Sequence, residues 1–144
     1  MLLVLPALML ASCSLFGDDD GLTELEQQRQ RWERLGINAY EYDLNRLCFF
    51  GHVGVVRVQV RADTVFAAAD LETGLPVVDQ PYRVMTVDGL FDVVKEAFER
   101  ADHLDVRYDE TFGYPAHVDI DYIENAVDDE VVYVAENLRP LRAP

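Results

Sequence analysis

The feature that most constrains the fold is a regular alternation of apolar and polar residues in the last third of the chain. Leu104 and Val106 alternate with charged residues, and the same pattern returns over residues 116–122. A period of two turns one face of a strand to a core and the other to solvent. A three-residue loop ending in Gly113 suits a hairpin, because glycine adopts the left-handed conformation that such loops need. These segments therefore predict an antiparallel hairpin that pairs Val106 with Val118.

Local patterns predict the remaining elements. A capping box of Thr23 and Glu26 predicts a helix that ends before Gly36, and Thr86 is the expected N-cap of a second helix. In chain order we expect a helix over residues 23–35, strands over 39–49, 56–61 and 64–69, a helix over 87–101, and strands over 103–109, 116–122 and 130–137. Turns are expected at residues 51–54 and 62–63, and a loop over 71–83. The order α-β-β-β-α-β-β-β predicts an α+β domain, a mostly antiparallel sheet of about six strands with both helices on one face.

The N-terminus predicts export and lipidation. An apolar run over residues 1–9 leads into Leu10-Ala11-Ser12-Cys13. A short apolar segment that ends in small residues is typical of a secretory signal, and a cysteine after Leu-Ala-Ser looks like a bacterial lipoprotein box. Twelve helical residues rise only about 18 Å, which is too short to span a membrane. We expect residues 1–12 to be a signal peptide, Cys13 to be lipidated, residues 13–21 to form a tether and residues 22–144 to form one domain.

This interpretation places the domain outside the cytoplasm, anchored to a membrane of the cell envelope through Cys13. No Lys or Arg precedes the apolar run, although a signal peptide normally begins with a basic segment. Two alternatives stay open. The segment is a buried N-terminal strand or helix, or it is cleaved without lipidation.

The net charge of the chain limits the classes of partner that it is expected to bind. The chain has 27 acidic and 12 basic residues, a net charge of −15. Nucleic acid demands Lys and Arg at its phosphates, and anionic lipid demands a basic surface, so neither is an expected partner. A cation or a basic partner remains compatible with this charge.

Few residues are suited to catalysis. The only serines, Ser12 and Ser14, lie in the signal and tether, which excludes a Ser-His-Asp hydrolase. The chain also lacks a Gly-rich phosphate loop, a His-Glu-x-x-His pair and an EF-hand. Cys48 is the one cysteine left after Cys13, and the alternatives for it are a buried strand residue, an intermolecular or redox role, and a nucleophile with His52 as its base. We expect no enzyme and no required cofactor.

The predicted hairpin gathers carboxylates on its polar face. Its register sets Asp105 opposite Asp119 and His103 opposite Asp121. Like charges that face each other are destabilising, and a hard cation such as Ca²⁺ would relieve them. Asn125 and residues 128–130 could lie nearby. Asp105, Asp119 and Asp121 are therefore candidate ligands for weak Ca²⁺ binding. The alternative is a solvated acidic face bridged by Arg107.

Aromatic residues also gather around this hairpin. Tyr108, Phe112, Tyr114 and Tyr122 would supply the large amphipathic area that binding surfaces favour. Ordinary core and turn packing is the alternative for all four residues. Together these features predict a membrane-tethered, non-enzymatic module of the cell envelope that binds a protein partner or a small ligand. A Ca²⁺-dependent structural protein of the envelope is the second candidate.

Several short motifs resemble one family. They are Tyr40-Glu41-Tyr42, Cys48-Phe49-Phe50, residues 86–98, Val106-Arg107-Tyr108-Asp109, Gly113-Tyr114-Pro115, Ile120-Asp121-Tyr122 and Asp128-Asp129-Glu130. Over residues 32–138 the chain is similar to an uncharacterised group of bacterial secreted and lipoprotein domains of unknown function. Members often have Cys-Phe-Cys where this chain has Cys48-Phe49-Phe50, so a disulfide or metal role of that motif is not carried over. The resemblance implies an envelope location and no particular chemistry.

Overall fold

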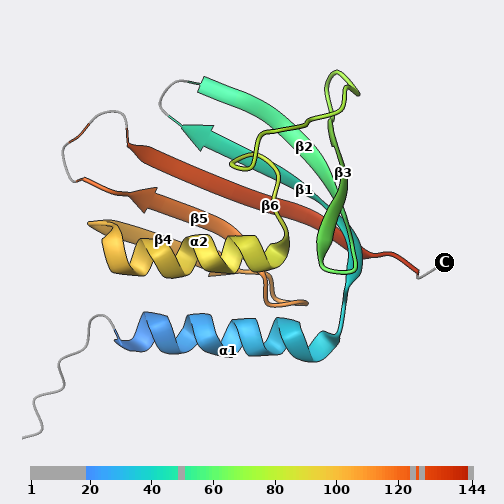
Figure 1. Cartoon of the computed structure of the whole chain (residues 1–144). Helices are drawn as coiled ribbons and strands as arrows, with labels where there is room; N and C mark the ends of the chain where they lie inside the picture. Colours follow the sequence, from blue (N-terminus) through green and yellow to red (C-terminus); the bar gives the residue numbers. More distant parts are fainter. Residues whose placement is uncertain (1–18, 49–50, 124–125, 127–128, 143–144) are drawn as a thin grey trace, which may run out of the picture.

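The expected α+β architecture is confirmed. The computed structural model of the chain describes residues 19–48, 51–123, 126 and 129–142 (Figure 1). These residues form two helices and one antiparallel sheet of six strands, in the strand order β3-β2-β1-β6-β5-β4. In chain order the elements are α1 (Asp19–Leu35), β1 (Ala39–Cys48), β2 (Gly51–Arg61), β3 (Thr64–Asp70), α2 (Val87–Arg100), β4 (His103–Tyr108), β5 (Pro115–Asp121) and β6 (Glu130–Pro140).

Both helices lie on one side of the sheet. In Figure 1, α2 packs against the strands and α1 runs beside it, while the described part of the chain places no helix on the opposite side. We call that opposite side the open face. Because successive strand residues point to opposite faces, each strand contributes one set of side chains to the core and another to the open face.

The core lies between the helices and the sheet. From β1 it takes Tyr40, Tyr42 and Leu44, each at most 1% exposed, and the ring of Trp32 meets Tyr40 edge-on at 5.3 Å. The other fully buried large side chains are Phe91, Leu90, Val94 and Val87 of α2, Val56, Val58 and Val60 of β2, and Val118 and Ile120 of β5. Burial of a side chain of this size stabilises a fold by about 1.5–3 kcal/mol.

Two tyrosines of β1 fix the start of α2. Thr86 is the N-cap, as predicted, and its hydroxyl accepts a hydrogen bond from the backbone N–H of Gly89. The hydroxyl of Tyr40 accepts a second helix N–H, that of Val87, at 2.8 Å. The hydroxyl of Tyr42 donates to the carbonyl of Met85 at 2.6 Å. The first turn of a helix leaves its N–H groups without intrahelical partners, and these contacts satisfy two of them.

The predicted turn at residues 62–63 and the predicted pairing of β4 with β5 are also confirmed. Ala62 and Asp63 both have positive φ, the signature of a two-residue hairpin turn, and Gly36 and Gly113 are left-handed where expected. In the β4–β5 hairpin, Leu104 pairs with Ile120 and Val106 with Val118. As far as Arg107 the observed register is therefore the one that the alternation predicts. The register then shifts, Tyr108 pairs with Pro115, and residues 109–114 connect the strands in place of the three-residue loop expected.

Three boundaries differ from the prediction. Helix α1 begins at Asp19 and not at Thr23, so residues 19–21 of the predicted tether are helical. Acidic residues at its start favour this, because they interact well with the positive end of the helix dipole. Strand β2 begins at Gly51, which pairs with Cys48, so the turn expected at residues 51–54 is wrong. Residues 49–50 lie outside the described residues. Strand β6 continues to Pro140, past the predicted end at residue 137.

Local irregularities explain the last two differences. Gly54 lies inside β2 with φ +81°, where a Cβ atom would come within 2.7 Å of a carboxylate oxygen of Asp70. Asn137 has φ +57° at a register shift between β1 and β6, and the strand resumes after it. Both residues look like turn formers in a sequence, yet in a sheet they mark β-bulges.

Candidate functional site

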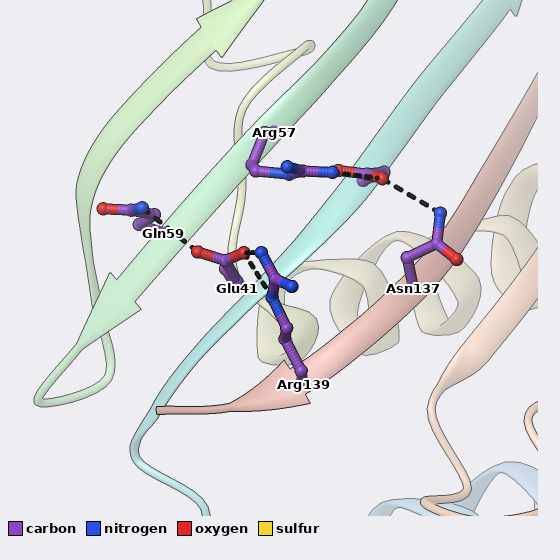
Figure 2. A network of polar contacts seen from close by, with 6 residues as sticks. Glu41, Arg57, Gln59, Asn137 and Arg139 are labelled. Atoms are coloured by element: carbon purple, nitrogen blue, oxygen red, sulfur yellow. Dashed lines mark hydrogen bonds and ion pairs between the residues drawn. The ribbon is translucent and has the colours of Figure 1, made fainter. Parts of the chain in front are cut away.

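Two carboxylates are buried on the open face, where no described helix covers them. Glu41 and Asp43 of β1 are 6% and 5% exposed. A carboxylate is rarely buried to this extent unless charged or polar groups are paired with it. The contacts that bury these two side chains come from the neighbouring strands β2 and β6, as Figure 2 shows.

Asp43 has three hydrogen bonds to two side chains. The guanidinium of Arg57 donates two, at 2.8 and 3.0 Å to the two carboxylate oxygens, and the amide of Asn137 donates one at 3.0 Å (Figure 2). Burial alone would raise the pKa of Asp43, but the hydrogen bonds and positive charge of Arg57, with the Asn137 hydrogen bond, bring it below its usual value. Asp43 therefore stays ionised at neutral pH and is unsuited to act as a general acid.

Glu41, two residues before Asp43 on β1, is likewise held by one side chain from β2 and one from β6. The amide of Gln59 on β2 donates to one carboxylate oxygen at 3.1 Å, and the guanidinium of Arg139 on β6 contacts the other (Figure 2). The β1–β6 pair is where strands β1–β3 meet strands β4–β6 in the sheet. The two carboxylates thus join the two halves of the sheet, a structural role that leaves their oxygens engaged.

The candidate cation ligands lie where the sequence predicts. Asp105 pairs with Asp119 and His103 with Asp121 across the β4–β5 hairpin, and Arg107 lies 4.0 Å from Asp105. Within the described ranges, however, no three His, Cys, Asp or Glu side chains come together closely enough to hold a metal ion. Asn125 and Asp128 lie outside the described residues. The contact with Arg107 favours the alternative of a solvated acidic face.

The aromatic residues that were expected to form an exposed binding surface are buried or half-buried. Tyr114 is 3% exposed, and burial raises its pKa to about 12. Tyr108 is half-buried and stacks on Phe91 of α2 with 6.5 Å between ring centroids, while Phe112 and Tyr122 pack partly against the core. Core and turn packing, the alternative interpretation, describes Tyr108, Phe112 and Tyr114 in this structure.

An acidic hollow of about 390 Å³ lies where the end of α1 meets the start of α2. Trp32, Glu33, Asp63 and Asp88 are among its lining residues. Burial raises the pKa of Asp88, the charge of Asp63 adds to this, and Arg29 opposes it. The ionisable side chains that line the hollow are the three carboxylates of Glu33, Asp63 and Asp88, and its lining includes no cysteine, serine, histidine or lysine.

Most of the exposed large apolar side chains come from one segment of the sequence. Of the eight large apolar side chains that the described part of the chain exposes, five fall between residues 66 and 82. They are Phe66, Leu71, Leu75, Val78 and Tyr82. Phe66, Leu75 and Val78 are 62%, 64% and 69% exposed. They do not all lie together, because Phe66 packs on Arg61 at the end of β2, whereas Tyr82 lies against Arg46 of β1. Phe66 and Val78 line one hollow, and that part of the segment is a candidate interaction surface.

A groove runs along the outer edge of β3 in this region. It has a volume of about 660 Å³ and is lined by residues 65–68, residues 76–81 and Val84, and we call it the β3 groove. The segment after β3 partly covers this edge. The N–H of Asp70 donates to Leu75 and that of Val77 donates to Ala68, each at 3.0 Å. A second hollow, of about 410 Å³, lies on the same strand beside Arg57, Gln59 and Leu71.

These surface residues and the buried carboxylates are absent from the sequence-based candidates. Leu75 and Val78 lie in a loop that contains Gly and Pro, and no periodic pattern there distinguishes them from Val77, which is buried. Glu41 and Asp43 alternate with the tyrosines of β1, so the period of two places them on the face opposite the core. That period is the one sequence signal for the network, but it does not predict their burial.

The chain belongs to a family of unknown function, DUF6174, which it matches over residues 24–140. No curated protein and no solved structure matches it significantly. Membership of this family identifies the chain as a domain of unknown function, and it assigns no activity to any residue.

Proposed function

We propose that this chain is a membrane-tethered, extracytoplasmic binding module without enzymatic activity, and that it binds through the β3 groove. The observation that carries the proposal is a pair of exposed apolar side chains that line this groove, Phe66 and Val78, which are 62% and 69% exposed. Exposed apolar side chains that line a hollow are typical of protein interaction sites.

The state of the buried carboxylates supports a binding role over a catalytic one. Asp43 and Glu41 are each held by two side chains, and Asp43 has a lowered pKa. Catalytic acids and bases usually have pKa values moved toward the working pH. The lowered pKa of Asp43 moves away from neutrality and fits a structural ion pair.

The N-terminal motif supports the tether. Five residues lie between Cys13 and Asp19, where α1 begins, and a fully extended chain over these six steps would span about 20 Å. The 17 residues of α1 add about 25 Å before the chain reaches β1. In Figure 1, β3 and the loop after it lie at the far end of the domain from the start of α1. A lipid at Cys13 would thus leave the β3 groove accessible to a partner. No helix in the described ranges is long and apolar enough to cross a membrane.

Intact mass tests the anchor. The full-length chain, expressed with a C-terminal tag in a bacterium, should lose residues 1–12 and carry the mass of acyl chains on Cys13. The Cys13→Ser variant should lose that mass and leave the membrane fraction. A mature chain that retains residues 1–12 would contradict the proposed anchor.

Photo-crosslinking tests the binding surface. A photoreactive amino acid at Val78 should give one discrete adduct in native membranes, whereas the same group at Ile123, which is 60% exposed and does not line the β3 groove, should give none. A second substitution, Phe66→Ser, should reduce the adduct at position 78. Two results would contradict a specific binding surface at β3: equal labelling from positions 78 and 123, or an amount of adduct that does not change on Phe66→Ser.

A further inference from the structure

We infer that the β3 groove binds an extended, basic segment of a partner protein, which adds as a strand to the uncovered part of β3. This inference rests on the proposed function and names the chemistry of the partner. It combines two observations on the same surface: the way in which the edge of β3 is already paired, and the charge around the groove.

The edge of β3 already accepts an antiparallel strand. Pro76 forms an antiparallel bridge with Ala69, and the flanking N–H groups of Asp70 and Val77 complete the pairing. This covers only the second half of β3. The β3 groove continues along residues 65–68, so an incoming extended segment would prolong the pairing that residues 75–77 begin.

A β-bulge lies at the uncovered part. Gln59 pairs with Ala67 and Val60 pairs with Val65, which leaves Phe66 as the extra residue on β3. The backbone of a bulged residue is not paired in its own ladder, and bulges often lie beside binding sites. Phe66 is also an exposed aromatic residue that lines the β3 groove, so it offers both a backbone edge and an apolar contact to the incoming segment.

Charge selects a basic segment. Asp79 is the one ionisable residue among those that line the β3 groove, and it is exposed. Arg57 is paired with Asp43 and Arg83 with Asp70. Arg61 lies over the ring of Phe66 and is not among the lining residues. A net charge of −15 on the chain attracts a basic partner from a distance and repels an acidic one.

The same charge disfavours two other occupants. A second copy of the chain would bring two strongly acidic domains together, with Asp79 of each copy at the contact. An anionic bilayer would be repelled by the domain for the same reason. Both serve as outcomes of the test.

Peptide binding to the full lipidated protein, held in nanodiscs of zwitterionic lipid, tests the inference. The probes are three fluorescent nine-residue peptides: one that alternates valine and lysine, one that alternates valine and glutamate, and a copy of the lysine peptide with alternate backbone amides methylated. The lysine peptide should bind at least about tenfold more tightly than either of the others, because methylation removes the edge hydrogen bonds and glutamate reverses the charge.

Matched variants locate the site. Asp79→Asn should weaken binding of the lysine peptide by about three- to tenfold, the range expected for one charged contact. Asn tolerates the positive φ of residue 79, so this variant keeps the loop conformation. Asp105→Asn on β4 removes the same charge from the other edge of the sheet and should leave the affinity unchanged.

The outcomes separate this inference from the proposed function. If the glutamate peptide binds as well as the lysine peptide, or Asp105→Asn acts like Asp79→Asn, the basic partner is wrong. If the methylated peptide binds equally, strand addition is wrong. In either case, the proposed function would still hold if Phe66→Ser reduced the photo-crosslinked adduct formed from position 78. A wild-type chain that dimerises or binds anionic vesicles through Val78, while binding no lysine peptide, would overturn the inference in favour of that occupant.

Discussion

Strands β4 and β3 form the two edges of one sheet, and their exposed sides differ in composition. On β4 the side chains that face solvent are His103, Asp105 and Arg107. Charged side chains on an edge strand discourage another chain from pairing with it. The inward side of β4 is anchored by a helix, because Tyr108 stacks on Phe91 of α2. This edge is both packed and protected.

On β3 the sequence between Thr64 and Ala69 has no ionisable side chain. The protection that charges give to β4 comes here from residues 75–77, which pair with only part of the strand. Phe66 and the apolar residues of the following loop stay exposed. An exposed apolar edge strand of this kind is an aggregation liability in a monomer, and a partner bound in the β3 groove, as we propose, would cover it.

Matched aromatic substitutions at the two edges should give the largest difference. Tyr108→Ala removes a ring that is half-buried against α2 and should lower the free energy of unfolding by about 2–3 kcal/mol. Phe66→Ala removes an exposed ring that lies against the guanidinium of Arg61, and should cost about 0.5–1 kcal/mol. Urea unfolding followed by circular dichroism measures both. Equal losses would show that β3 is packed as firmly as β4.

The junction between the two halves should be the next most sensitive place. Asp43→Asn keeps the shape of the side chain but removes the charge that Arg57 and Asn137 bind, and should cost about 1–2 kcal/mol. Asp92→Asn is the control, because the Arg29–Asp92 pair has the same 2.8 Å separation but Asp92 is 67% exposed. That control should change stability by less than about 0.5 kcal/mol. If the two variants lose the same amount, burial of the network contributes nothing.

Lowering the pH should change the free energy of unfolding by less than these substitutions do. Asp43 and Asp88 should contribute to this change with opposite signs. The pKa of Asp43 is lowered in the folded state, so its stabilisation is present above its unfolded pKa of about 3.9 and is lost as the pH falls through the folded value. The pKa of Asp88 is raised, so its ionisation disfavours the folded state as the pH rises above about 3.9. Stability of wild type relative to Asp43→Asn should therefore shrink below pH 4.

Asp88→Asn provides the opposite control. This variant should be slightly more stable than wild type at pH 7, and the difference should vanish in acid. Unfolding free energies at pH 7, 4 and 3 check both variants. An advantage of wild type over Asp43→Asn that persists unchanged at the lowest pH would contradict the role given to the Asp43 charge.

Most of the fold follows from patterns of nearby residues. The alternation in β4 and β5 set their register, Thr86 and the apolar stripe after it gave α2, and Ala62-Asp63 gave a hairpin turn. Each of these signals depends on the period of a strand or helix or on local turn chemistry. The errors occurred where a residue that usually ends an element lies inside one, as Gly54 and Asn137 do, because only pairing with a neighbouring strand reveals a bulge.

The sequence by itself determined the α+β class, the strand order along the chain, the acidic charge and the motif around Cys13, because these depend on composition and short-range periodicity. Only the tertiary structure decided which strands became edges and which side chains stayed exposed. It buried Tyr114, joined Glu41 and Asp43 to partners up to 98 residues away, and left Phe66 and Val78 in solvent. The physical reason is that burial depends on residues distant in the chain that converge on the same place, and no local pattern records which of them will do so.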